Sequence, residues 1–131
     1  MDTIEFIDSL QRDKARGYLA PHQIILLMSL HKVYSKNRSI VIRISDLLET
    51  FKKVWENNQY LFKSKNCNLG LPLKAFVNKG FIEITITEEI NDYRNKNELT
   101  TKISELKLSH LILNIINKKD SYEYFKSRIN K

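Results

Sequence analysis

The residues best suited to catalysis are few, and their spacing matches no catalytic or metal-binding motif. The three histidines, His22, His31 and His110, have no cysteine partners and no His-Glu-x-x-His spacing, so neither a zinc hydrolase nor an HNH-type nuclease centre is indicated. The single cysteine, Cys67, cannot form an internal disulfide or supply a cysteine-based zinc site. We therefore expect no metal and no disulfide, and we interpret His31 as a packing residue.

One short pattern is similar to part of a nuclease active site. Glu105-Leu106-Lys107 follows a predicted strand, and Asp92 is an upstream carboxylate that suits a divalent metal. Glu-x-Lys nevertheless arises readily by chance in a sequence rich in both residues. The three glycines form neither a dinucleotide-binding fingerprint nor a P-loop. We therefore predict a protein that is not an enzyme and uses no cofactor.

The basic charge is concentrated in one region of the chain. Lys and Arg number 22 against 15 Asp and Glu, and residues 32–79 hold ten basic and three acidic side chains. Residues 81–100 have the opposite balance, with two basic and five acidic side chains. A localised basic field favours a polyanion such as nucleic acid, with an anionic membrane or an acidic protein as alternatives. A lysine-rich solubilising surface would also explain the charge.

The composition predicts one folded domain over residues 1–131. Hydrophobic residues make up 42% and charged residues 28% of the 131 residues, which is typical of a globular protein with a real core. The longest apolar run, Ile24 to Met28, is far shorter than the roughly 20 residues of a membrane span. The first residues lack the basic start of a signal peptide. We therefore expect a cytoplasmic protein that does not contact a membrane.

Periodicity and punctuating residues predict a helix-dominated α+β fold. Gly17 is expected to end the first helix, Pro21 to open the second, and Gly80 to cap the helix that begins at Pro72. Helices are predicted over residues 3–15, 21–34, 45–55, 72–79, 108–116 and 121–129, strands over 40–44, 81–86 and 99–103, and a basic loop over 57–70. This order predicts a winged-helix-like core with a small antiparallel sheet and additional flanking helices.

In a winged-helix unit, the second helix of the tight helix pair presents its outward side chains to a DNA groove. The corresponding segment here is Leu71 to Lys79. Helical spacing directs Leu73, Phe76 and Val77 toward the core and Lys74, Asn78 and Lys79 outward. A short amphipathic helix with two lysines is also common in small domains that bind no DNA, so the spacing alone leaves both interpretations open.

Two segments resemble the sulfur-binding domain found in type IV restriction endonucleases and related HNH proteins. Ala20-Pro21-His22-Gln23-Ile24-Ile25-Leu26-Leu27 is similar to the Pro-His pattern and Leu-rich helix of that family. Leu71-Pro72-Leu73, then Phe76, then Asn78-Lys79-Gly80-Phe81-Ile82-Glu83-Ile84 resembles its second signature. The chain departs from the family where Gln23 replaces a basic residue, Leu71 an aromatic one and Ile82 a tryptophan.

The resemblance implies a non-catalytic module that recognises double-stranded, phosphorothioate-modified DNA in bacterial restriction or defence, acting with a partner nuclease. It implies that Leu71 and Pro72 line a small apolar cavity for the sulfur and that His22 and Gln23 flank it. The DNA-binding residues would be His22, Gln23, Lys63, Lys65, Leu71, Pro72, Lys74, Asn78 and Lys79.

Simpler interpretations of the same residues remain open at this point. Pro21 and Pro72 suit helix N-termini in any protein, His22 is an ordinary first-turn polar residue, and Leu71 is expected in the core. The alternative functions are a generic winged-helix DNA-binding protein that has lost the sulfur site, and a protein–protein adaptor. An adaptor would use as its interface the apolar second helix or the acidic tip, the segment rich in Asp, Glu and Asn that follows the strand predicted over residues 81–86.

Overall fold

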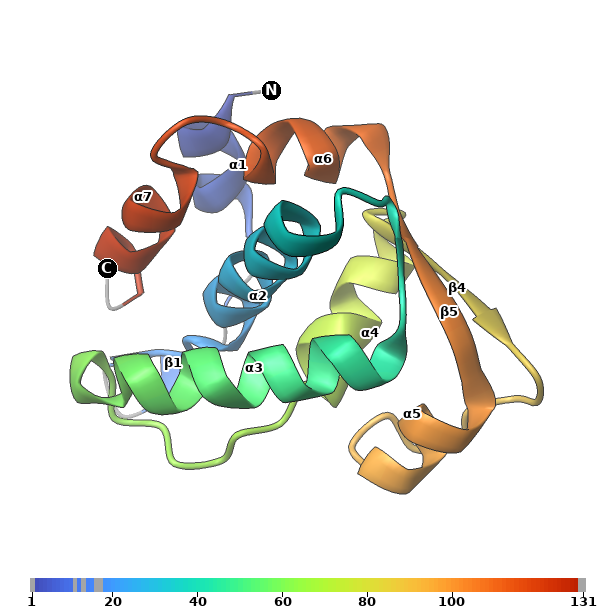
Figure 1. Cartoon of the computed structure of the whole chain (residues 1–131). Coiled ribbons are helices and arrows are strands. Elements are labelled where there is room, and N and C mark those ends of the chain that lie inside the picture. Colours follow the sequence, from blue (N-terminus) through green and yellow to red (C-terminus); the bar gives the residue numbers. More distant parts are fainter. Residues whose placement is uncertain (1, 11, 13, 16–17, 130–131) are drawn as a thin grey trace.

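Helices predominate in the structure, a computed structural model that describes residues 2–10, 12, 14–15 and 18–129. The helices are α1 (Thr3–Ser9), α2 (His22–Asn37), α3 (Ile44–Asn58), the 3₁₀ turn η1 (Gln59–Leu61), α4 (Gly70–Asn78), α5 (Lys96–Lys102), α6 (His110–Ile116) and α7 (Ser121–Ser127). The strands are β1 (Lys14–Ala15), β2 (Tyr18–Leu19), β3 (Val41–Ile42), β4 (Ile82–Ile86) and β5 (Ile103–Leu108). The predicted α+β class is confirmed (Figure 1).

Three strands form the small antiparallel sheet, in the order β3-β5-β4. The central strand β5 places Lys107 opposite Val41 of β3 and Glu83 of β4. Read along the chain, the order is α2, β3, α3, α4, β4, α5 and β5, so the helix α5 stands between the last two strands, where the predicted winged-helix order has only a turn. Helices α1, α6 and α7 are the additional flanking helices, and they gather at the end of the molecule away from the tip of the sheet (Figure 1).

Helix α2 is the centre of the core and packs against α3, α4, α6 and α7. Its residues from Ile24 to Leu30 are all buried, which matches the apolar character of this segment on every side. The one polar residue among them, Ser29, donates its hydroxyl to the carbonyl of Ile25 at 2.7 Å, so no buried polar group is left without a partner there. On α3, Phe51 and Trp55 complete the core as predicted.

The N-terminal prediction was wrong beyond residue 9. Helix α1 ends at Ser9, and Leu10 is already extended with φ −67° and ψ 130°. Residues 14–15 pair with residues 18–19 in a second, two-stranded sheet. The predicted stop, Gly17, lies outside the described residues. Helix α3 also starts earlier than predicted, at Ile44 after Arg43, because the strand before it contains only two residues.

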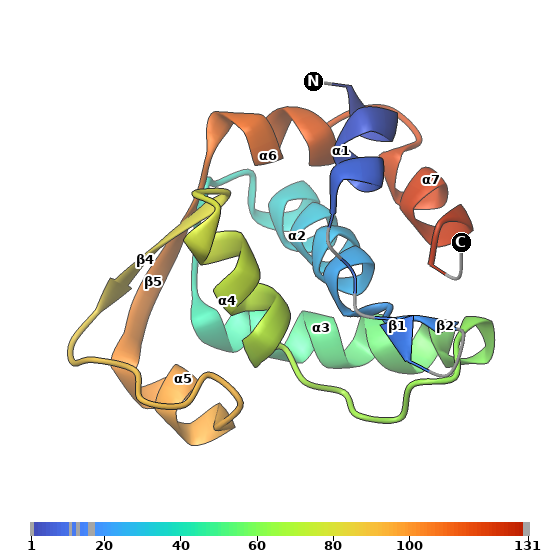
Figure 2. The same ribbon diagram turned by 180° about the vertical axis from the view of Figure 1, so that it is seen from behind.

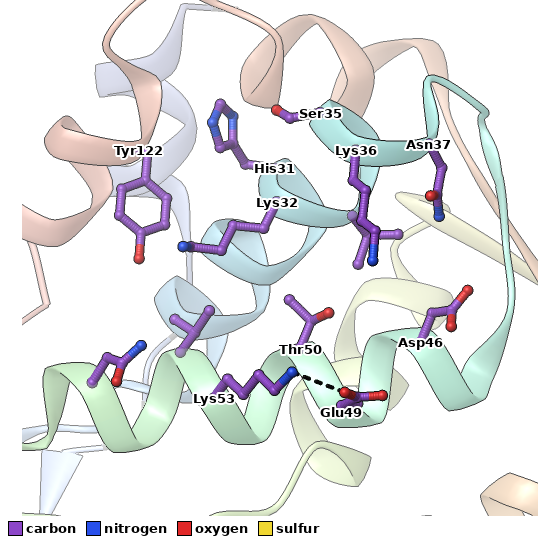
Figure 3. Close-up of a pocket in the computed structure, with 13 residues that line it drawn as sticks. His31, Lys32, Ser35, Lys36, Asn37, Asp46, Glu49, Thr50, Lys53 and Tyr122 are labelled. Carbon is purple, nitrogen blue, oxygen red and sulfur yellow. Dashed lines mark hydrogen bonds and ion pairs between the residues drawn. The ribbon is translucent and has the colours of Figure 1, made fainter.

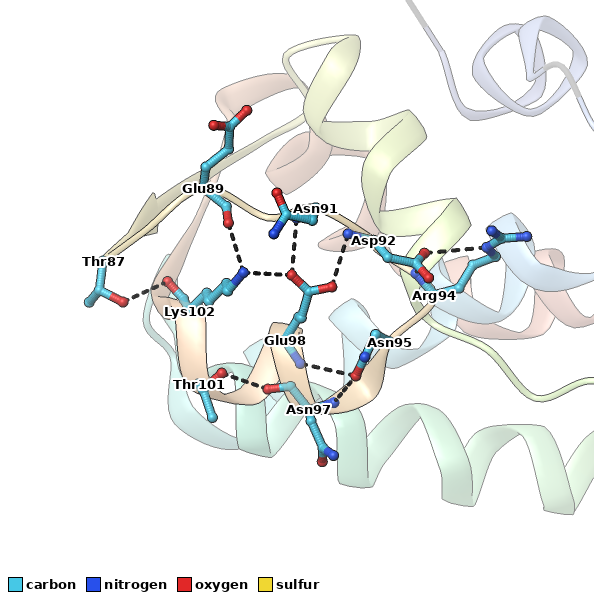
Figure 4. A network of polar contacts seen from close by, with 10 residues as sticks. All are labelled: Thr87, Glu89, Asn91, Asp92, Arg94, Asn95, Asn97, Glu98, Thr101 and Lys102. Carbon is cyan, nitrogen blue, oxygen red and sulfur yellow. Dashed lines mark hydrogen bonds and ion pairs between the residues drawn. The ribbon is translucent and has the colours of Figure 1, made fainter.

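The strand predicted over residues 99–103 was also wrong, since residues 99–102 lie in α5 and the partner strand of β4, β5, begins only at Ile103 and runs to Leu108. The Asn95 side chain accepts hydrogen bonds from two backbone amides in the first turn of α5 and caps it. Glu98 accepts from Lys102 Nζ at 2.6 Å and from the amides of Asn91 and Asp92 at 3.0 Å (Figure 4). This network fixes the connection between β4 and α5.

None of the helices in the described part of the chain has the length and apolar character needed to cross a bilayer.

Candidate nucleic-acid interface

One pocket is lined by residues from both segments that resemble the sulfur-binding domain. It has a volume of about 280 Å³ and lies between the start of α2 and the start of α4. Its described lining residues are Arg12, Ala20, His22, Gln23, Asn66, Asn68, Leu71, Pro72 and Ala75. We call it the α2–α4 pocket. Figure 2 shows α4, the loop that leads into it and the short β1–β2 sheet on the same side of the molecule.

The apolar wall of the α2–α4 pocket comes from one face of α4. Ala75 lies four residues after Leu71 and three after Pro72, and these two spacings bring side chains together on the surface of a helix. Pro72 is buried close to the start of the helix, where its missing amide hydrogen costs nothing. Sequence analysis missed Ala75, although its position four residues after Leu71 was a usable signal.

Leu71 is exposed, and this corrects the expectation that it belongs to the core. Its side chain is 53% exposed, whereas Leu73 two residues later is completely buried. An isolated exposed leucine is common on protein surfaces and needs no explanation by itself. Here it stands beside Pro72 on the wall of a pocket, so its side chain is available to a ligand.

His22 holds the basic loop against the start of α2. Its Nε2 atom lies 2.7 Å from the carbonyl oxygen of Asn66, and because a carbonyl only accepts, Nε2 must carry the proton. The imidazole ring also packs on Trp55, with 4.9 Å between ring centroids. His22 therefore positions the loop that brings Asn66 and Asn68 to the pocket.

Arg12 supplies a cation to the α2–α4 pocket, and no sequence motif marked it. Its guanidinium donates to the carbonyl of Ala20 at 3.0 Å, to that of Arg128 at 3.0 Å and to that of Ile129. Desolvation by burial, together with the charge of Arg128, lowers the pKa of Arg12 to about 10. The group stays positively charged at neutral pH, and its position is fixed by backbone from both ends of the chain.

The predicted outward face of α4 is confirmed. Lys74, Asn78 and Lys79 are exposed, while Phe76 is buried and Val77 is half-buried. The Lys74 ammonium lies 5.7 Å from the centroid of the Tyr93 ring. Gly80 has φ +76°, as expected for a left-handed helix cap.

The structure thus brings four of the nine predicted residues together in one lining and places the others outside it. His22, Gln23, Leu71 and Pro72 line the α2–α4 pocket. The exposed residues Lys63 and Lys65 lie on the loop, and Lys74, Asn78 and Lys79 lie on or just after α4. None of these five side chains belongs to the described lining of the α2–α4 pocket.

The weak nuclease-like pattern does not form a cluster. Glu105 and Lys107 are exposed on β5, and Asp92 lies in the acidic tip, where its carboxylate pairs with Arg94 Nε at 3.3 Å. Among the residues that the structure describes, no group of three or more His, Cys, Asp or Glu side chains is arranged to hold a metal ion. Lys107 instead belongs to a polar stripe on the sheet, opposite Glu83.

A larger groove of about 750 Å³ lies between α2, α3 and α7, away from α4. Two of its lysines interact with a neighbouring side chain. Lys53 pairs with Glu49 at 2.9 Å, and the Lys32 ammonium lies 5.1 Å from the centroid of the Tyr122 ring (Figure 3). His31, at its edge, contacts the carbonyl of Ile116 at 2.7 Å, which agrees with the packing role predicted for it.

The α2–α4 pocket combines an apolar wall, side-chain amides and a fixed cation. Such a set of groups suits an anion that carries one weakly hydrated atom, because the cation balances the charge and the apolar wall accepts that atom. A scan against protein-family models and a search of curated proteins both give no match for this chain.

Proposed function

We propose that this protein is a non-catalytic module that binds double-stranded DNA and recognises a phosphorothioate linkage. One observation carries the proposal: the two segments that resemble the sulfur-binding domain, far apart in the sequence, contribute His22, Gln23, Leu71 and Pro72 to a single pocket. The exposure of Leu71 supports it, because a core leucine would leave the pocket without its outer apolar wall.

The chemistry of the pocket fits a sulfur-substituted phosphate. Sulfur is larger and more polarisable than oxygen and is less strongly hydrated, so an apolar wall accepts it at a lower desolvation cost. The linkage keeps its negative charge, which Arg12 at the pocket complements. Gln23 offers an amide in place of a basic side chain, and Arg12 supplies the cation from another segment.

The surrounding exposed residues would hold the duplex. Lys63, Lys65, Lys74 and Lys79 are exposed and would contact the phosphate backbone, and the exposed Asn78 would contact a base edge. Backbone contacts fix the register of the DNA, so the modified linkage can be presented to the pocket. In bacterial restriction or defence, such a module would deliver a partner nuclease to modified DNA.

The alternative functions are a protein–protein adaptor and a generic winged-helix DNA-binding protein. The adaptor loses one of its two candidate interfaces. The apolar side chains of α2 from Ile24 to Leu30, which an adaptor would use as an interface, are buried in the core. The acidic tip remains exposed at Glu88 and Glu89. A generic winged-helix DNA-binding protein would keep the lysines and would show no preference for sulfur.

DNA binding is expected to be electrostatic and to fall steeply with salt. If four lysines each neutralise one phosphate, affinity should drop by about a hundredfold between 50 and 200 mM salt. Reversing Lys63, Lys65, Lys74 and Lys79 to Glu should abolish binding in a fluorescence anisotropy titration with a short duplex. A control variant reverses two other lysines, Lys118 and Lys119, which are exposed between α6 and α7. Absence of binding by the wild type at micromolar concentration and low salt would overturn the proposal.

The purified protein is expected to leave DNA intact. Plasmid incubated with Mg²⁺ or Mn²⁺ should remain supercoiled, with or without phosphorothioate linkages, because Glu105, Lys107 and Asp92 do not converge on one site. The measurement is an agarose gel time course. Nicking that disappears in both Glu105→Ala and Lys107→Ala would contradict this expectation.

A further inference from the structure

A second pocket lies on the other side of the loop that borders the α2–α4 pocket. It has a volume of about 420 Å³ and is enclosed by α3, the loop of residues 62–69 and the turn that leads into α5. We call it the α3–α5 pocket. Its floor is apolar and includes the buried side chains of Phe51, Trp55 and Leu99.

Cationic side chains from three separate segments surround the α3–α5 pocket. Lys52 comes from α3, Lys65 from the loop, and Arg94 and Lys96 from the turn before α5 and its first residue. All four are exposed. Arg94 pairs with Asp92 at 3.3 Å, and Glu56 is the single carboxylate among the described lining residues. The rim therefore has a net positive charge and suits an anionic ligand.

The two pockets are neighbours in a fixed arrangement. Asn68 lines both of them, so the loop forms a ridge between them. The Asn68 carboxamide accepts from the Gly70 amide at 2.7 Å and donates to the Arg94 carbonyl at 3.3 Å. His22 fixes the same loop on its other side through Asn66. The two pockets are therefore separated only by this ridge.

We propose that the α3–α5 pocket binds unmodified backbone phosphates of the same duplex, next to the phosphorothioate held in the α2–α4 pocket. This inference rests on the proposed function. It adds Lys52, Arg94 and Lys96 to the DNA-contacting residues, none of which was predicted from the sequence. It also assigns a division of roles: the α2–α4 pocket distinguishes sulfur from oxygen, and the α3–α5 pocket adds affinity for any duplex.

Cys67 provides a built-in reporter of the α3–α5 pocket. It is the only cysteine in the chain, it is exposed, and it lines this pocket. Desolvation by its surroundings, with a smaller contribution from the charge of Glu56, raises the pKa of the Cys67 thiol above its ordinary value. The thiolate is the reactive species, so alkylation with iodoacetamide is best followed at mildly alkaline pH.

The experiment compares the alkylation rate of Cys67 in the free protein and with saturating unmodified duplex, phosphorothioate duplex or inorganic phosphate at equal ionic strength. Both duplexes are expected to slow alkylation by about tenfold or more, and inorganic phosphate to leave the rate unchanged. The double variant Lys52→Glu with Lys96→Glu should weaken binding of both duplexes alike, by about tenfold or more, and keep their affinity ratio. The control is again the reversal of Lys118 and Lys119.

The outcomes separate this inference from the proposed function. Two results would overturn the α3–α5 site alone. One is that duplex binds the wild type while Cys67 is alkylated as fast as in the free protein. The other is that duplex binds the double variant with unchanged affinity. Equal affinity for the two duplexes together with protection of Cys67 would uphold this site and contradict sulfur recognition. Absence of any duplex binding would overturn both, and protection by inorganic phosphate would point to a free anion as the ligand.

Discussion

Replacing Leu71 by Asp is expected to remove the preference for a phosphorothioate duplex over the same duplex with phosphate. The substitution replaces the exposed apolar wall of the α2–α4 pocket with a carboxylate, which repels the anion and offers the sulfur atom a polar surface. Discrimination of one atom in an apolar site is worth about tenfold to two-hundredfold in affinity. The ratio of the two affinities should therefore fall to about one.

The measurement is a pair of anisotropy titrations of the variant at a single salt concentration. Leu71→Met keeps an apolar side chain of similar volume and should retain the preference. Lys74→Ala is the second control, because it removes charge outside the pocket lining and should weaken both duplexes alike. If Leu71→Asp leaves both binding curves unchanged, Leu71 has no contact with the DNA.

Replacing Gly70 by Ala is expected to have the largest effect on stability. A Cβ atom at position 70 would lie 1.7 Å from the carbonyl oxygen and 2.5 Å from the carbonyl carbon of Tyr93. These are backbone atoms, so the contact cannot be relieved by rotating a side chain. Overpacking of this kind costs about 3 kcal/mol of the free energy of unfolding. Because Gly70 begins α4, the shift would also displace the wall of the α2–α4 pocket.

Gly80→Ala is the matched control for the Gly70 variant. Gly80 has φ +76° and open space around its missing Cβ, so the substitution carries only the cost of a left-handed conformation, about 1–2 kcal/mol. Urea unfolding followed by circular dichroism should give the lower midpoint for Gly70→Ala, with an unchanged slope. A wild-type midpoint for Gly70→Ala would mean that α4 and the turn at Tyr93 are not packed as described.

Several parts of the fold were predictable because local residues determine them. Pro21, the uniformly apolar run that follows it, and Gly80 marked α2 and the end of α4 correctly. Residues 99–103 were predicted to return as the partner of the strand over residues 81–86, but residues 99–102 are helical. In the structure, the Asn95 cap and the Glu98–Lys102 ion pair stabilise a helix there instead. This ion pair is largely shielded from solvent, since only 12% of the Lys102 side chain and 17% of the Glu98 side chain are exposed.

The candidate site was only partly predictable, because its missing members depend on tertiary contacts. Arg12 is held by carbonyl groups of residues 128 and 129, and a backbone carbonyl leaves no signal in the sequence. Lys52 and Lys96 appear in the sequence as ordinary charged helix residues, and only the fold places them around one pocket. Leu71 was expected in the core because leucine is usually buried. Its exposure depends on how α4 packs against α2 and β4, which the sequence does not reveal.

The most direct test of the central claim is a paired titration of the wild-type protein. Two duplexes of identical sequence are compared at one salt concentration, one with a single phosphorothioate of defined stereochemistry and one with phosphate at that linkage. If Leu71 and Pro72 recognise sulfur, one of the two phosphorothioate stereoisomers should bind about tenfold to two-hundredfold more tightly than the phosphate duplex. Equal affinity for phosphate and for both stereoisomers would contradict the assignment of the α2–α4 pocket to sulfur.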